Sequence, residues 1–205
     1  MARMLTCIGL IGLLALSGFG QSERRVEQIR DLLGKSDLVV VAVAETYRPV
    51  IDQLKYRRER ERSPVLDPAR AERYMLGVVY QMTVREVIYR HPKHVERGLS
   101  VGQPGETLLL YVPGRLADPR EFGKAAFLPG GAYLVFLKRA ELKREDFRWA
   151  VEQTLGAPAS EWRSFPDPRL TYYTPIHDPF AVLLMEGAWK DFLDQTRAVA
   201  SGLRP

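Results

Sequence analysis

The chain has 205 residues, of which 46% are hydrophobic and 27% charged, and its formal net charge is +5. This composition is ordinary for a globular protein, and the mild basic excess permits anionic partners without requiring them. Cys7 is the only cysteine, which excludes an intramolecular disulfide, so the stability of the chain must come from a packed core.

The N-terminal segment has the order of a secretory signal peptide. Arg3 supplies a positive charge, residues 5–16 (LTCIGLIGLLAL) carry none, and glycines flank Phe19 as a small-x-small cleavage pair. The apolar run is shorter than the roughly 20 residues that span a bilayer. We therefore expect residues 1–20 to be removed and residues 21–205 to form one exported domain, periplasmic or extracellular, without a transmembrane span.

The first half of this domain combines a helix, a strand and a polar connection. Helical spacing of apolar residues predicts a surface helix over 22–33, which Gly34 would end. The β-branched run 38–44 (LVVVAVA) predicts a central strand that continues to Tyr47. The following segment, 48–73, is polar and interrupted by prolines, so we interpret it as a long loop with one helical turn at most.

Further strands follow along the chain. Residues 74–89 alternate between apolar and polar side chains, which is typical of a half-buried strand, and the change of phase near Glu86 predicts a bulge. Two more strands, 107–112 and 132–137, are each bounded by Pro-Gly turns, and residues 147–155 are a weaker fifth candidate.

The C-terminal part combines aromatic residues with a helix. Residues 180–184 fit either a strand or the start of a helix, and residues from about 188 to 201 predict an amphipathic helix. We interpret the proline-rich stretch 157–179, which contains aromatic residues, as a flap packed on the core, with an aromatic ligand platform as the alternative. The predicted fold is mainly β with flanking helices (α+β): a five-stranded barrel core over about 36–155 and an extension over 156–205.

Three segments resemble the netrin-like or tissue-inhibitor-of-metalloproteinase type of OB-fold. They are the SDLVVV opening at 36–41, the strand end at 84–88, and the PGGAYLVFL segment at 129–137. Together they span about half of the chain. The resemblance implies a five-stranded OB-like barrel. The cysteines through which that family inhibits metalloproteinases are absent here, so inhibition is not implied.

The strongest local feature is the basic segment 55–62 (KYRRERER), which lies between the first two predicted strands. In OB-folds this connection borders the groove that takes oligonucleotides or oligosaccharides. A solvated, self-paired surface is the simpler interpretation of its interspersed charges. In the functional interpretation its arginines contact anionic groups and its tyrosine stacks on a sugar or base. The residues of this predicted ligand site are Tyr56, Arg57, Arg58, Arg60 and Arg62.

A second constellation, His91, His94 and Glu96, offers two imidazoles and a carboxylate, a usable zinc set. Pro92 makes a helix through both histidines unfavourable, so only a loop could bring them together. The simpler interpretation is a solvated turn after a strand.

No catalytic motif is visible: there is no Gly-x-Ser-x-Gly elbow and no phosphate-binding glycine loop. We therefore expect a non-enzymatic binding or interaction domain, without a cofactor, for an anionic polymer such as a glycan or for an acidic protein partner. Export argues against nucleic acid as the natural ligand. The alternatives are a metal-dependent enzyme using His91, His94 and Glu96, and a structural cell-envelope component that docks through Trp189 and Phe192.

Overall fold

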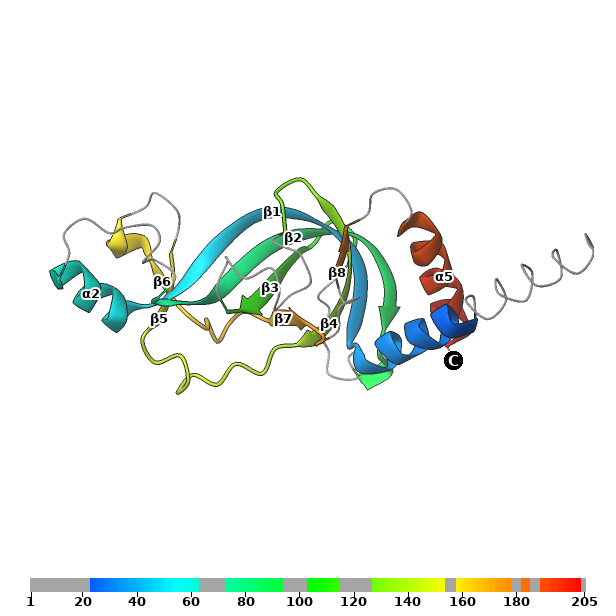
Figure 1. The fold of residues 1–205 in the computed structure, drawn as a ribbon, viewed down its shortest axis with the longest axis horizontal. Helices are drawn as coiled ribbons and strands as arrows, with labels where there is room; N and C mark the ends of the chain where they lie inside the picture. The colour runs from blue at the N-terminus through cyan, green and yellow to red at the C-terminus, as the bar shows by residue number, and fades with distance from the viewer. Residues whose placement is uncertain are drawn as a thin grey trace, which may run out of the picture.

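A computed structural model describes residues 23–62, 73–93, 103–114, 127–153, 158–177, 182–184 and 189–203. Strands dominate, and helices lie near both ends of this part of the chain, at residues 23–35 and in α5 (Figure 1). This confirms the predicted mainly β chain with flanking helices. The labelled elements are β1 (Leu38–Asp52), α2 (Gln53–Arg62), β2 (Met75–Arg90), β3 (Thr107–Pro113), β4 (Ala132–Arg139), β5 (Ala150–Glu152), η1 (Ala159–Glu161), β6 (Arg163–Ser164), β7 (Tyr172–Pro175), β8 (Val182–Leu184) and α5 (Trp189–Gly202).

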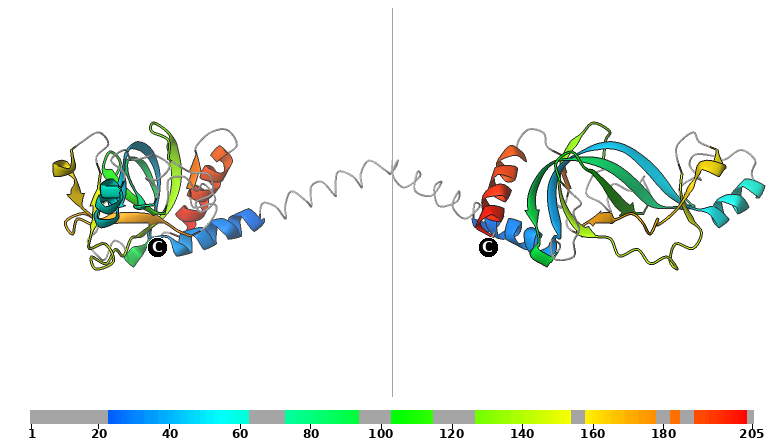
Figure 2. Two further views of the ribbon diagram at one scale, coloured as in Figure 1. Left: turned by 60° about the vertical axis from the view of Figure 1, so that its left-hand side comes forward. Right: turned by 180° about the vertical axis from the view of Figure 1, so that it is seen from behind.

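The strands of the described chain belong to one sheet of eight, in the order β6-β5-β1-β2-β3-β7-β4-β8. Because β1 also pairs with β4, the pairings run from β1 through β2, β3, β7 and β4 and return to β1. The pairing of β3 with β7 is parallel, and the other pairings are antiparallel. The right-hand view of Figure 2 shows that the longest strands curve between α2 at one end and α5 at the other.

The strands β1 and β2 pair along nearly their whole length and enclose the main core together with β3 and β4. The predicted bulge is confirmed: between Val41 and Ala42 the register shifts, and the partner changes from Glu86 to Val84. By strand alternation Leu76 falls on the core face of β2, but it packs against a second cluster around Tyr111. The buried side chains on that face are Val78, Tyr80, Met82 and Val84.

Asp37 joins the start of β1 to the ends of β2 and β4. Its N–H donates to the carbonyl of Leu137 (2.8 Å), and its carbonyl accepts from the N–H of His91 (2.9 Å). Its carboxylate accepts from the N–H of Arg139 (2.8 Å). The neighbouring Ser36 hydroxyl is buried and donates to a carbonyl of the last helical turn. The backbone and carboxylate of Asp37 therefore fix the start of β1 against β2 and β4, and the Ser36 hydroxyl ties it to the helix.

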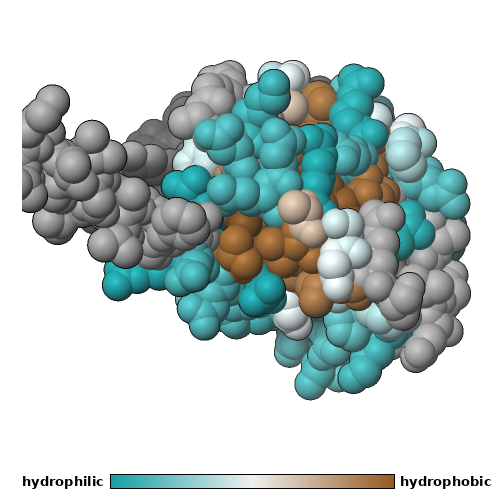
Figure 3. All heavy atoms as spheres, turned by 90° about the vertical axis from the view of Figure 1, so that its right-hand side faces the viewer, coloured by the Kyte–Doolittle hydropathy of each residue, from teal (hydrophilic) through white to brown (hydrophobic). Residues whose placement is uncertain are grey.

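Both terminal helices pack at the same end of the sheet. Ile29 from the first helix and Phe192 from α5 share one apolar cluster with Val39 and Ile88, and Figure 3, which looks onto this end, shows apolar side chains framed by polar ones. Phe192 is 4% exposed, so its ring contributes to packing within the chain. None of the helices in the described ranges combines the length and apolar character needed to span a membrane.

The prediction of a loop over 48–73 is wrong for residues 48–62, which complete β1 and form α2; residues 63–72 lie outside the described ranges. Pro49 is tolerated in β1 because of its position. Its carbonyl accepts from the N–H of Gln153, and the β5 ladder on that side begins only at Val50. Since the nitrogen and carbonyl of a strand residue face the same neighbour, the missing N–H lies at the end of that ladder.

The fifth member of the ring of pairings also differs from the prediction. In the described part of the candidate over 147–155, up to residue 153, only the short β5 forms, and it pairs with β1 outside the ring. The place between β3 and β4 is taken by β7, whose Tyr172 and Tyr173 are buried. The open choice at 180–184 is resolved for residues 182–184, which form β8 against β4.

Gly77 lies where β2 approaches β3 closely, so a substitution at this position tests that contact. A Cβ at this position would lie 2.6 Å from both Tyr111 Cε2 and the Val112 carbonyl oxygen. We expect Gly77→Ala to lower the free energy of unfolding by about 1–3 kcal/mol, as overpacking does, when measured by urea denaturation.

Gly34→Ala is the matched control. Gly34, predicted to end the first helix, lies inside it, and a Cβ at this position would meet no atom within 4 Å outside its own helix. Alanine there should stabilise the protein by about 0.5–1 kcal/mol. Equal effects of the two substitutions would contradict this account of the β2–β3 contact.

Candidate ligand-binding site

The helix α2 begins at a side-chain cap. One carboxylate oxygen of Asp52, at the end of β1, accepts from the N–H groups of Leu54 (3.0 Å) and Lys55 (3.1 Å). Such a cap satisfies donors that the first helical turn leaves unpaired. The Lys55 ammonium lies 3.8 Å from the other oxygen of Asp52. The turn from strand to helix is therefore specified locally.

Helix α2 contributes little to the core, since none of its residues is buried. Its main anchor is Tyr56. The Tyr56 ring stands edge-on to the rings of Tyr74 and Trp162, with 5.2 Å between centroids in each pair. Aromatic pairs in this geometry attract each other beyond their shared buried area. Tyr56 therefore holds α2 against the segment that contains η1.

A pocket of about 310 Å³ lies between α2 and η1. Three of the residues predicted to bind a ligand come together in it, and its lining includes two arginines and one glutamate, all from α2. The charged side chains of the lining therefore add up to a formal net positive charge. The lining residues are Gln53, Tyr56, Arg57, Arg60, Glu61, Ala159 and Trp162.

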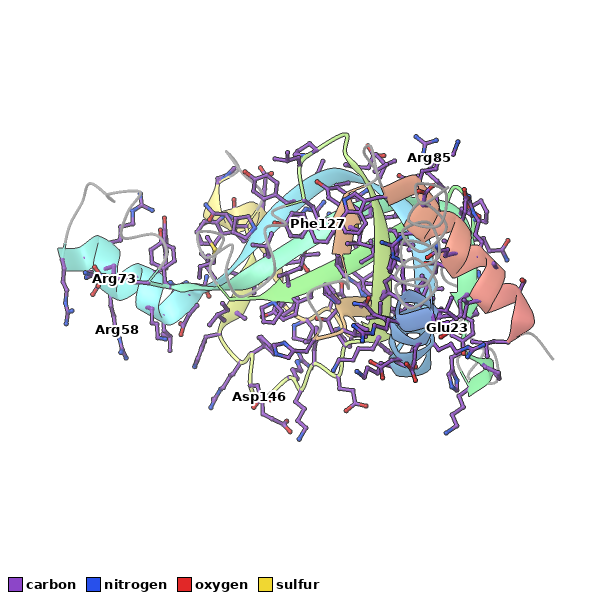
Figure 4. The ribbon with its side chains drawn as sticks, turned by 45° about the vertical axis from the view of Figure 1, so that its right-hand side comes forward. Glu23, Arg58, Arg73, Arg85, Phe127 and Asp146 are labelled. Carbon is purple, nitrogen blue, oxygen red and sulfur yellow. The ribbon has the colours of Figure 1, made fainter. Side chains whose placement is uncertain are left out.

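The other two predicted residues, Arg58 and Arg62, do not line this pocket. Both are exposed, and Figure 4 shows the side chain of Arg58 extending from α2 into solvent. Helical geometry explains the division, because Tyr56, Arg57 and Arg60 lie one turn apart or adjacent on one side of the helix. An interpretation of the segment as a loop could not make this distinction.

Trp162 contributes an unpaired polar atom to this site. Its indole Nε1 is buried and has no hydrogen-bond acceptor among the described residues. Leaving a buried N–H without an acceptor costs about 1–3 kcal/mol. An acceptor oxygen that reached this N–H after movement of a neighbouring side chain would offset that cost.

A buried polar cluster lies on β5, which pairs with the end of β1 from which α2 begins. Glu152, on β5, is 4% exposed, and its Oε1 accepts from the hydroxyl of Tyr172 at 2.8 Å. Arg48 approaches its other oxygen at 3.6 Å. Burial raises the pKa of Tyr172, and the Glu152 carboxylate adds to the effect, so the phenol keeps the proton that it donates. The Tyr172 oxygen also accepts from the N–H of Asp167 (3.3 Å).

The predicted metal set is only partly described. His91 is half-buried, its Nδ1 accepts from the N–H of Lys93 (3.2 Å), and its ring stands edge-on to Tyr89. His94 and Glu96 lie outside the described residues, so this set stays a prediction. Within the described ranges, no three His, Cys, Asp or Glu side chains lie close enough to hold a metal ion.

Sequence reasoning misses Gln53 and does not assign Trp162 to a site. The interpretation of 157–179 as a packed flap is right that Tyr172 and Tyr173 are buried, but they form strand β7 of the sheet. It does not describe Trp162, which lines the pocket. A local signal for α2 is present, because residues 53–62 contain neither glycine nor proline and consist mainly of good helix formers. No local signal indicates that η1 faces α2.

The Glu152 cluster gives a stability prediction. Tyr172→Phe removes the hydrogen bond to a buried carboxylate, and we expect a loss of about 1–3 kcal/mol in the free energy of unfolding. Tyr89→Phe is the control, because no hydrogen bond of the Tyr89 hydroxyl is found in the described part of the chain. Chemical denaturation measures the free energy of unfolding of both variants. Similar losses would show that the hydrogen bond from Tyr172 to Glu152 contributes little to stability.

Comparisons with known proteins found no match: no protein-family model, no curated protein sequence and no solved structure matches this chain.

Proposed function

We propose that this chain is an exported, non-enzymatic binding domain that holds an anionic ligand in the pocket between α2 and η1. The observation that carries the proposal is the grouping of Arg57 and Arg60 with Trp162 around one pocket. Guanidinium groups bind carboxylates, sulfates and phosphates through paired hydrogen bonds. The rings of Trp162 and Tyr56 add an apolar surface beside these charges.

The architecture offers a reason for this location. We propose that the ring formed by β1, β2, β3, β7 and β4 is an OB-like barrel, with α2 in the connection between its first two strands. In OB-folds that connection borders the ligand groove. The parallel pairing of β3 with β7 and the return of the pairings to β1 support this assignment. Export rests on the apolar N-terminal run of the sequence, and it makes a glycan or an acidic protein a more fitting ligand than nucleic acid.

The two pairs of arginines on α2 provide the test. Arg57→Gln with Arg60→Gln removes two charges that line the pocket, whereas Arg58→Gln with Arg62→Gln removes two that do not. Glutamine preserves helix propensity, so α2 should form in both variants. We expect the first variant to lose about tenfold or more in affinity for a fluorescent oligogalacturonate, and the second to lose less than about threefold.

Affinity is measured by fluorescence anisotropy over a salt series. Binding that weakens with salt in the parent protein and in the Arg58/Arg62 variant supports a charged pocket. Equal losses in both variants would show that affinity follows the net charge of α2 instead. Absence of binding to oligogalacturonate, to a sulfated glycan and to an acidic peptide at low salt would overturn the proposed function.

A further inference from the structure

A second pocket, of about 510 Å³, adjoins the first at Gln53, the one residue that lines both. The Gln53 N–H donates to the carbonyl of Trp149 at 2.9 Å, which ties the start of α2 to the wall of this second pocket. Its other walls come from the segment around Asp146, labelled in Figure 4, and from the residues after β6. The two pockets are therefore neighbours across the beginning of one helix.

The second pocket repeats the composition of the first. Arg144 and Arg148 line it together with Glu145 and Trp149, so each pocket offers two arginines, one glutamate and one tryptophan. The chain has three tryptophans in all, and two of them line these pockets. A repeated set of binding groups is suited to a ligand that repeats its own chemistry.

Trp149 is held in place although it is 47% exposed. The Arg148 guanidinium lies 5.2 Å from the centroid of its ring, within the range of a cation–π contact. The indole therefore keeps an apolar surface towards solvent without collapsing onto the core. Large exposed aromatics of this kind are characteristic of binding surfaces.

We propose that the two pockets are subsites for one linear acidic polysaccharide, with each tryptophan contacting a sugar ring and each arginine pair contacting carboxylates or sulfates. This inference rests on the proposed function and adds the ligand class and the second subsite. A polysaccharide presents a ring face and an acidic group in every unit, which the repeated Trp and Arg sets match. An extended peptide prefers a long free strand edge, whereas β6, at this edge of the sheet, has only two residues.

The test compares ligand lengths. A galacturonic acid disaccharide can fill one pocket, and a decasaccharide can reach both. We expect the decasaccharide to bind the parent protein at least about tenfold more tightly, because its second contact is intramolecular. Trp149→Ala should remove most of this advantage, so that the decasaccharide binds no more than about twofold more tightly than the disaccharide. Leu170→Ala, which truncates another exposed apolar residue (43% exposed) that lines neither pocket, should change neither affinity.

The outcomes separate the two proposals. Failure of every anionic probe to bind overturns the proposed function, as above. Disaccharide binding that depends on Arg57 and Arg60, with no gain for the decasaccharide, leaves the proposed function in place and overturns the second subsite. A polyglutamate peptide that binds as tightly as the decasaccharide, and with the same dependence on Trp149, overturns the polysaccharide class in favour of an acidic protein partner.

Discussion

The arrangement of the whole molecule depends on the use of both edges of β1. One edge pairs with β2 almost throughout, while the other pairs first with β4, through Leu38–Val43, and later with β5, through Val50–Asp52. A strand that changes partners along its length must curve, and the register shifts against β2 accommodate that curvature. The same strand therefore belongs to the main core at its start and supports α2 at its end.

This arrangement gives the candidate site a firm base of strands and a weakly anchored helix. The hydrogen bonds of β1, β2 and β5 and the buried Glu152 cluster form a firm base. The helix above it contributes no buried side chain and is held by the Asp52 cap and the Tyr56 ring contacts. Local opening is easiest where few apolar contacts must be broken. The pocket wall made by α2 is thus the part best able to adjust to a ligand.

The sequence patterns predict those elements whose side chains report their surroundings directly. Alternation identifies β2, and β-branched residues identify the start of β1, because burial on defined faces requires those patterns. The polarity of α2 suggests a loop, but polarity describes exposure and not backbone conformation, so this helix escapes prediction. Strand β7 escapes it because only four residues form it, and its partners lie far away in sequence. Arg57 and Arg60 can be identified because they lie in one basic segment. Trp162 and Trp149 cannot, because only the tertiary structure places them beside α2.

Both ends of the described chain lie at the end of the molecule opposite α2, as the label on Glu23 and the position of α5 show (Figures 1 and 4). An attachment made beyond either end, whether a fusion partner or a solid support, would therefore hold the protein by its helical base. The arginine- and tryptophan-lined tip would then project outwards. Because the pockets lie opposite these ends, the domain can be immobilised or displayed in a defined orientation. Its two pockets would then be accessible even to ligands too large to diffuse freely.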